Sequence, residues 1–295
     1  KAASAGDLYS WGQFLGKRYK NFSNIIWLIG GDTDPSVVKD KVLEMIRGIS
    51  ENDTLHLFSA HNQPETMAID PWDEESWLTV NNVYSYDSIL YRHCKAAYTK
   101  NPPMPYYLCE SAYENEHQST PQQLRSQAYQ AVLSGSMGHI FGNCPVWHFG
   151  AFKSWCNLTD WKTELNNSGS VSMYHFQRLF RSRSWQLLIP DFEHRLLTAG
   201  FGTWGLKDYV TTAITNDGNT LIAYLPSRRT ITVDLSKISG EIAKCWWYDP
   251  SCGKTVNIGT FKARGYQNFT PVSESDWILV IDNDSKNLPE PGKLK

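Results

Sequence analysis

The chain has 295 residues, a formal net charge of −2 at pH 7 and 41% hydrophobic residues. This length allows two domains with a sizeable core, and the small net charge without a basic cluster argues against nucleic acid and acidic membrane surfaces as partners. No apolar run approaches the roughly 20 residues that cross a bilayer, so the sequence predicts no membrane span.

Helix and strand patterns alternate over about the first 142 residues. Leu8, Trp11, Leu15 and Tyr19 recur at spacings of three and four, which is typical of an amphipathic helix. We expect helices over residues 7–20, 35–49, 88–99 and 120–134, and strands over 24–30, 54–61, 78–84, 105–109 and 138–142. Strands that alternate with helices predict a parallel sheet with right-handed crossovers.

The pattern changes near residue 190, where strand-like runs begin to alternate with turns. We expect strands over 209–216, 221–225, 231–235, 243–248 and 277–281. The run Asn216-Asp217-Gly218 between the first two is a hairpin signal. The sequence therefore predicts an α/β domain over residues 1–190, a small antiparallel β-sandwich over 191–283 and a flexible tail over 284–295.

The α/β domain is too short for a complete barrel. Five strands are expected, the first element is a helix, and a complete (β/α)8 barrel takes about 250 residues. The predicted fold class is α/β plus all-β, with about strands 4–8 of a TIM barrel followed by the sandwich. Because an open parallel sheet exposes its edge and inner face, we expect a missing N-terminal segment or another chain to complete the barrel.

Cysteines and glycosylation sequons favour an extracellular protein. Among the six cysteines, Cys245 and Cys252 flank a turn across which they could pair. Six sequons begin at Asn21, Asn52, Asn157, Asn166, Asn268 and Asn283. No zinc-site spacing, phosphate loop or nucleophile elbow appears, so we expect no metal and no cofactor. These patterns predict a secreted glycoprotein with disulfides.

Two carboxylates carry the functional argument, because each follows an apolar strand. Asp32 comes two residues after the strand at 24–30, and Glu110 directly follows the strand at 105–109. The carboxyl ends of parallel barrel strands meet at one mouth, and paired acids there suit a glycosidase. We expect a separation of about 5–5.5 Å, the retaining distance, rather than about 6.5–9.5 Å. The alternatives are a helix cap made by Asp32 or Asp34, and a loop role for Glu110 with Glu114 and Glu116 as rivals.

Several motifs resemble the apiosidase-like glycoside hydrolases in the right order over nearly the whole chain. The string at 18–32 (RYKNFSNIIWLIGGD) resembles their fourth-strand motif, and Leu108-Cys-Glu-Ser-Ala-Tyr-Glu114 resembles their seventh. Residues 135–142 with Trp147 resemble their eighth-strand segment. Residues 247–253 and 275–279 resemble their C-terminal sandwich, which is labelled collagen-binding. Ser111, where a proline is common, and the run at 83–86 depart from the pattern.

The resemblance implies a (β/α)8 barrel with retaining chemistry on side chains of plant polysaccharides, apiose in rhamnogalacturonan II being the known case. It also implies that Asp32 is the acid/base and Glu110 the nucleophile. Tyr84 or His61 could donate a hydrogen bond to Glu110 from a neighbouring strand. The predicted substrate-binding residues are those near the expected mouth: His61, Asn62, Tyr84, Tyr113, His139 and Trp147. A structural role is the alternative for His61, and core packing is the alternative for Trp147.

Two functions therefore compete. The first is a secreted, retaining glycoside hydrolase that cleaves glycosidic bonds in polysaccharide side chains, with a carbohydrate as its partner. The alternative is a non-catalytic extracellular protein that keeps the glycosidase fold for carbohydrate binding, structure or assembly. The presence of both acids favours the enzyme, whereas the absent strands favour the alternative.

Overall fold

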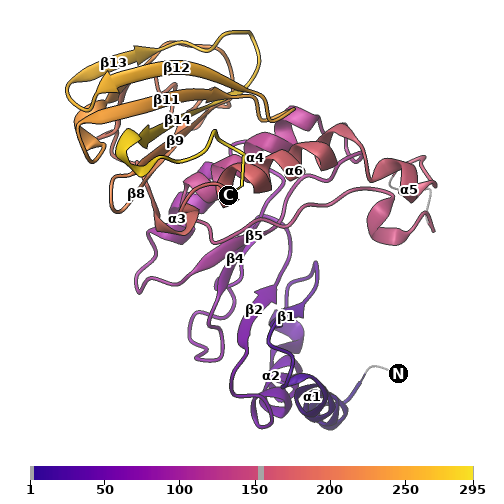
Figure 1. Cartoon of the computed structure of the whole chain (residues 1–295). Helices are drawn as coiled ribbons and strands as arrows, with labels where there is room; N and C mark the ends of the chain where they lie inside the picture. Colours follow the sequence, from indigo (N-terminus) through magenta and orange to yellow (C-terminus); the bar gives the residue numbers. More distant parts are fainter. Residues whose placement is uncertain (1–2, 152–155, 295) are drawn as a thin grey trace.

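The computed structural model describes residues 3–151 and 156–294, and its first half combines helices with short parallel strands (Figure 1). A capping box between Ser4 and Asp7 starts the first helix, and Thr120 caps the helix that begins at Pro121. The elements of this half are α1 (Ala5–Tyr19), β1 (Ile26–Gly30), η1 (Ser36–Val38), α2 (Lys39–Ser50), β2 (Leu57–His61), β3 (Thr66–Met67), β4 (Asn81–Tyr84), α3 (Tyr91–Tyr98), β5 (Tyr106–Glu110) and α4 (Pro121–Leu133).

The parallel strands lie side by side in chain order. β1 pairs with β2, and β4 pairs with β5, both in parallel. β2 and β4 are joined where the Val80 N–H donates to the Phe58 carbonyl at 2.9 Å. Residues 137–140 continue the order along β5, through a parallel bridge between Leu108 and His139. All carboxyl ends therefore point to one edge, as the alternating pattern predicts.

The second half contains two antiparallel sheets. One has the strand order β12-β11-β14-β9-β8-β6, and the other has the order β13-β10-β7. A shared core lies between them, with Val233 of the smaller sheet packed in one cluster with Ala223 and Leu279 of the larger. The strands are β6 (Leu188–Pro190), β7 (Leu197–Ala199), β8 (Thr211–Thr215), β9 (Thr220–Leu225), β10 (Ile231–Asp234), β11 (Ile242–Tyr248), β12 (Thr255–Lys262), β13 (Tyr266–Phe269) and β14 (Trp277–Asn283).

Helices α4 and α6 (Ser168–Arg181) connect the two halves, and Figure 1 shows them between the larger antiparallel sheet and the parallel strands. The outer face of that sheet contributes Ile222 and Ile278 to a core with Tyr129 of α4 and Leu179 of α6. α6 was not expected from the sequence, although its apolar residues Met173, Phe176 and Phe180 recur at helical spacing. The other strands and helices that were not expected include β3, η2 (Val146–His148), α5 (Trp161–Glu164), β6, β7, β12 and β13.

Two expectations are wrong in the structure. The disulfide joins Cys144 and Cys156, whereas Cys245 is buried and free and Cys252 is exposed and free. The C-terminal segment is folded rather than a flexible tail, since residues 284–286 form η5 and the Arg178 guanidinium donates to the Gly292 carbonyl at 2.8 Å.

The structure also bears on the expected glycosylation sites and on the expected absence of a membrane span. Among the six sequons, Asn283 is only 5% exposed and its side chain donates to Asn219, so this asparagine is not available for a glycan. Within the described ranges, no helix is both long and apolar enough to cross a membrane.

Candidate active site

The end of β1 carries Asp32 on a turn that requires glycine. Gly30 has φ of 106°, and a Cβ there would lie 2.4 Å from the His61 carbonyl oxygen of β2. Glycine therefore allows β1 to stay close to β2 while the chain turns. Asp32 itself has φ of 48°, and its side chain is 72% exposed. Its backbone N–H donates to His61 Nδ1 at 3.1 Å, which fixes the turn against β2.

The end of β5 carries Glu110 through a β-bulge. Val83 pairs with Leu108 but Tyr84 pairs with Glu110, so Cys109 is an extra residue in the ladder. Regular alternation would place Glu110 on the face of Leu108, which packs in the core beneath α3 and α4. The bulge instead turns the carboxylate toward β2, where Glu110 Oε2 accepts from His61 Nε2 at 3.0 Å. The Glu110 side chain is 15% exposed.

Two tyrosine hydroxyls lie between the acids. The Tyr84 hydroxyl donates to Asp32 Oδ1 at 3.2 Å, and the Tyr86 hydroxyl donates to Glu110 Oε1 at 2.7 Å. The two hydroxyls lie 2.9 Å apart. His61 contacts Glu110 from the other side. The carboxylate of Glu110 therefore has a donor on each oxygen.

These contacts determine the charge state of Glu110. Burial raises its pKa, but the hydrogen bonds from His61 and Tyr86 outweigh burial, so the pKa of Glu110 lies below its ordinary value. Burial also raises the pKa of both tyrosine hydroxyls, which keeps them as donors. Hydrogen bonds with Cys109 and Glu110 raise the pKa of His61, whereas the Asp32 N–H fits only an unprotonated Nδ1. Because Nδ1 accepts the Asp32 N–H and Nε2 faces the Glu110 carboxylate, we assign the neutral tautomer of His61 with its proton on Nε2.

The two acids share one space. A carboxylate oxygen of Asp32, one of Glu110 and a ring nitrogen of His61 all lie within 4.8 Å of one another. The structure therefore brings the two acids together at one edge of the sheet, as expected from their places after parallel strands. A second compact group, Cys144, His148 and Cys156, has both sulfurs in the disulfide. We assign neither group as a metal site.

The rival carboxylates have other tasks. Asp34 accepts from the Ser36 N–H before α2. Glu114 is buried and accepts from the Gly169 and Ser170 N–H groups at the start of α6, which confirms the structural alternative for this residue. Asp34, and not Asp32, therefore makes the contact at the start of the helix that was the alternative role for Asp32.

The remaining predicted substrate-binding residues separate into two groups. Tyr113 lies beside Glu110: burial and then the Glu110 carboxylate raise the pKa of its hydroxyl. A Cβ on Gly142 would lie 2.5 Å from its ring, so glycine makes room for the ring. Trp147 is 45% exposed, and its indole donates to Glu116 at 2.8 Å in the neighbouring loop. Both side chains remain on the edge where the strands end.

Asn62 and His139 lie elsewhere, so the structure does not support a sugar contact for either. Asn62 is 3% exposed, and its amide donates to the Met67 and Ala68 carbonyls. His139 lines an apolar cavity of about 410 Å³ beside α6, where it packs edge-on against Phe176. Burial there lowers the pKa of His139 to about 4. Side-chain alternation places His139 on the helix-covered face with Leu108, which position in the motif alone does not reveal.

Sequence reasoning missed Tyr86 and Cys109. Tyr86 was detectable in principle, because it lies two residues after Tyr84 and side chains two apart in an extended chain share a face. Cys109 was not, since its contact with His61 depends on the bulge.

Comparison with known proteins identifies the family. Residues 1–186 match the family model described as the apiosidase-like catalytic domain, which is more than half of the chain. The chain belongs to the apiosidase-like family. Residues 204–282 of this apiosidase-like protein match a second model, labelled as the collagen-binding domain of a collagenase. No curated protein matches the sequence. The family resemblance deduced from the motifs is therefore confirmed.

Solved structures agree with this assignment at the level of the fold. A glycoside hydrolase is 24% identical with a TM-score of 0.88, and covers 97% of this chain and 71% of its own. A family 5 glycoside hydrolase from Bacteroides vulgatus is 23% identical with a TM-score of 0.87, covering 97% and 68%. An arabinose-bound α-L-arabinofuranosidase is 10% identical with a TM-score of 0.53, covering 96% and 53%. Together with the family match, they make this apiosidase-like protein a glycoside hydrolase.

Proposed function

We propose that this glycoside hydrolase retains anomeric configuration, with Glu110 as the nucleophile and Asp32 as the acid/base. The observation that carries the proposal is that one carboxylate oxygen of Asp32 and one of Glu110 lie within 4.8 Å of each other at one edge of the sheet. Retaining enzymes separate their acids by about 5–5.5 Å, whereas inverting enzymes leave room for a water molecule. The differing environments of the two acids also suit two different roles.

In the proposed reaction, a Glu110 oxygen attacks the anomeric carbon while Asp32 gives its proton to the departing glycosidic oxygen. A covalent glycosyl ester and a free alcohol result. Asp32 then takes a proton from water, whose oxygen attacks the same carbon and releases Glu110 as a carboxylate. His61 and Tyr86 hold Glu110 in position and keep it ionised before the first step.

The substrate we propose is a sugar at the end of a polysaccharide side chain, with apiose as the first candidate. Support comes from the family name and from the arabinose-bound structural neighbour, since apiose and arabinose are both five-carbon sugars. Tyr113 and Trp147 are the aromatic side chains on this edge that suit contact with a sugar ring.

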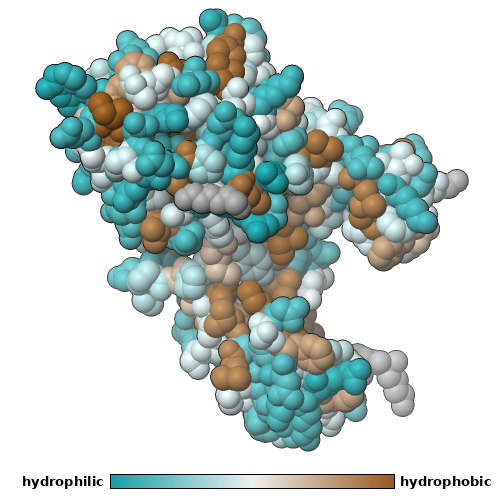
Figure 2. Space-filling view, viewed as in Figure 1, coloured by the Kyte–Doolittle hydropathy of each residue, from teal (hydrophilic) through white to brown (hydrophobic). Residues whose placement is uncertain are grey.

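We also propose that residues 1–190 form the last five units of a (β/α)8 barrel, and that a preceding segment or another chain completes it. Both outer parts of the sheet expose apolar side chains: Ile26 and Leu28 of β1 are 43% and 41% exposed, and Ile140 is 51% exposed. Figure 2 shows hydrophobic side chains gathered near the parallel strands below the two-sheet half. The two glycoside hydrolases above are longer than this chain, which covers 71% and 68% of them. The disulfide supports the further proposal that the protein is secreted.

Turnover of a panel of aryl glycosides by the natural full-length protein tests the function. Asp32→Asn and Glu110→Gln should both lose activity, while the matched control Asp34→Asn should keep it. Unchanged turnover in either site variant would remove that residue from the mechanism. If the unmodified protein binds oligosaccharides but cleaves none, the non-catalytic alternative is correct instead.

A further inference from the structure

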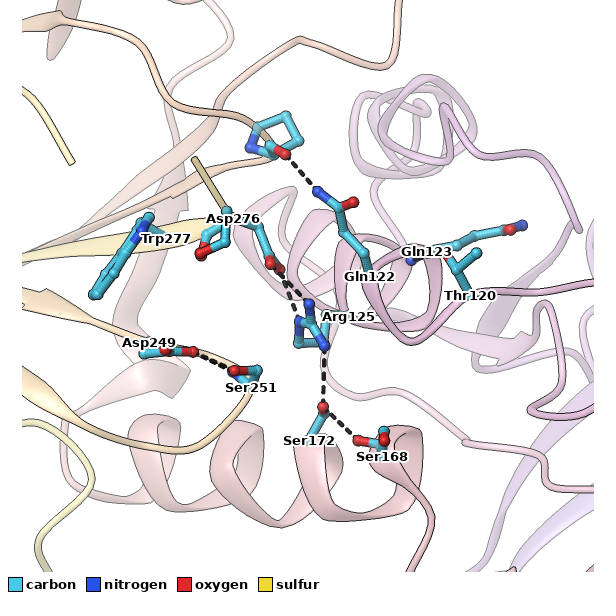
Figure 3. Close-up of polar contacts among 12 residues, drawn as sticks. Thr120, Gln122, Gln123, Arg125, Ser168, Ser172, Asp249, Ser251, Asp276 and Trp277 are labelled. Atoms are coloured by element: carbon cyan, nitrogen blue, oxygen red, sulfur yellow. Dashed lines mark hydrogen bonds and ion pairs between the residues drawn. The ribbon is translucent and has the colours of Figure 1, made fainter. Parts of the chain in front are cut away.

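Helix α4 is fixed on one side to the antiparallel half of the molecule. The Arg125 guanidinium donates to both oxygens of Asp276, at 2.8 and 2.7 Å, just before β14 (Figure 3). It also donates to the Ser172 hydroxyl of α6 at 3.3 Å. Arg125 and Asp276 are 8% and 2% exposed, so this is a buried, two-point ion pair. α4 therefore provides a fixed base for side chains on its opposite face.

Gln127 lies on that opposite face, because two residues along a helix correspond to a rotation of about 200°. Its side chain is fully buried and contacts the backbone of two different loops. Gln127 Oε1 accepts from the Ala112 N–H at 3.2 Å, and Gln127 Nε2 donates to the Asp87 carbonyl at 2.9 Å. Ala112 follows Glu110 by two residues, and Asp87 follows Tyr86 directly.

The same two segments are also joined at the site itself: the Tyr86 hydroxyl donates to the Glu110 carboxylate at 2.7 Å, and the Ser85 N–H donates to the Glu110 carbonyl at 3.1 Å. A hydrogen bond of this kind weakens steeply when its partners separate by a few tenths of an ångström. Without the Gln127 amide, the Ala112 N–H and the Asp87 carbonyl would lose their partner in a buried region, and the loops would have to shift to satisfy them.

We propose that Gln127 is a positioning residue that holds the Tyr86 hydroxyl on the Glu110 carboxylate. The inference rests on the proposed function, and it assigns a task to a helix residue that touches no substrate. It also gives the antiparallel half a part in the site, since that half anchors α4 through Asp276.

The pKa of Glu110 depends on the hydrogen bond from the Tyr86 hydroxyl, so it can be used to follow that contact. The groups that face it are His61 of β2, Tyr84 and Tyr86 of β4 and its loop, Tyr113 after β5, Asp32 after β1 and the neighbouring Cys109. Removal of the Tyr86 donor should raise the pKa of Glu110, because a hydrogen bond to the charged form is lost. Removal of Gln127 should raise the pKa of Glu110 as well, because the Tyr86 hydroxyl would shift away from the carboxylate. The variant itself replaces none of the groups that face Glu110.

The experiment measures the carboxyl pKa of Glu110 by carbon-13 NMR in the intact chain labelled at glutamate, with Glu110→Gln used to assign the signal. Gln127→Met, of similar length, should raise this pKa in the direction seen for Tyr86→Phe, and should add nothing in a Tyr86→Phe background. Gln130→Met is the matched control, because Gln130 is equally buried on α4 and contacts Ser88, Tyr91 and Ser126 but no group of the segment after β5. Gln127→Leu, which is also uncharged and of similar volume, replaces Gln127→Met if that variant does not fold.

The inference is overturned if Gln127→Met leaves the Glu110 pKa unchanged while Tyr86→Phe raises it, or if the two effects simply add. It is equally overturned if Tyr86→Phe has no effect or if Gln130→Met raises the pKa as much as Gln127→Met does. None of these results depends on turnover. The proposed function fails separately, if Glu110→Gln still cleaves glycosides.

Discussion

The carboxyl ends of β1 and β5 present the same kind of side chain in opposite surroundings. Asp32 is 72% exposed and its carboxylate accepts from a single tyrosine hydroxyl at 3.2 Å. Glu110 is 15% exposed and accepts from His61 and Tyr86 at 3.0 and 2.7 Å. The difference matches two chemical tasks, since an acid/base must exchange protons with water and a nucleophile must stay ionised and aligned. The following changes test this asymmetry.

Glu110→Gln should have the largest effect, because it removes the carboxylate that we propose as the nucleophile. We expect kcat/KM to fall by about 10⁴-fold or more for every substrate, whatever its leaving group. Steady-state kinetics on aryl glycosides measures this loss. A variant that keeps a tenth of the activity would contradict the assignment.

Asp32→Asn should have a large effect that depends on the leaving group. A leaving alcohol of high pKa needs the proton, so its release should slow by about 10²–10⁴-fold. A nitrophenolate leaves without a proton, so the same variant should cleave nitrophenyl glycosides with a much smaller loss. Equal losses for both types of leaving group would assign Asp32 a role other than acid catalysis.

Gly30→Ala should distort the turn after β1 that carries Asp32. The new Cβ would meet the His61 carbonyl at 2.4 Å, and φ of 106° is unfavourable for alanine. We expect unfolding free energy to fall by about 1–3 kcal/mol in urea titrations, with turnover also reduced. Gly138→Ala is the control, because no atom lies within 4 Å of a Cβ there. Equal stability of the two variants would contradict the close approach of β1 to β2.

The pH profile should show the stabilised charge of Glu110. Because its pKa is lowered, the nucleophile stays ionised below the ordinary glutamate range, and the acid limb of kcat/KM should lie there too. Tyr86→Phe should move this limb to higher pH, whereas the exposed Tyr266→Phe should not. Because the pKa of Glu110 is lower in the folded protein than in the unfolded chain, ionised Glu110 stabilises the fold. This contribution should be present at neutral pH and be lost as the pH falls through the lowered pKa. If Tyr86→Phe leaves the acid limb of kcat/KM at the same pH, a group other than Glu110 determines the position of that limb.

Tyr84→Phe should have the smallest effect of the set. It removes one hydroxyl from an exposed carboxylate that water can solvate, so we expect only about a 2- to 10-fold loss of kcat/KM. A loss as large as that of Asp32→Asn would mean that Tyr84 itself takes part in proton transfer.

Much of the fold was predictable because its strongest signals are local. Thr120 caps α4, the hairpin at Asp217 and Gly218 joins β8 to β9, and the helices and strands up to residue 134 lie close to their expected ranges. The Cys144–Cys156 pairing was not predictable, since it depends on how the loop after residue 142 folds back. The ordered C-terminal segment was missed because its contacts with Arg178 and Arg183 are more than 100 residues away in sequence.

The site shows the same division. Asp32 and Glu110 could be chosen because each acid ends an apolar strand, and the parallel order brings those ends together. His139 could not be separated from His61 by position in a motif, because the face to which each points depends on strand register. The β-bulge at Cys109 reverses the alternation that the sequence suggests for Glu110.

Trapping the covalent intermediate tests the central claim most directly. A 2-deoxy-2-fluoro glycoside with a good leaving group slows the second step, so the glycosyl ester should accumulate and be located by peptide mass spectrometry. We predict a single label on the peptide that contains Glu110, present in Asp32→Asn and absent in Glu110→Gln. A label on another residue, or cleavage with inverted configuration and no label, would contradict the account.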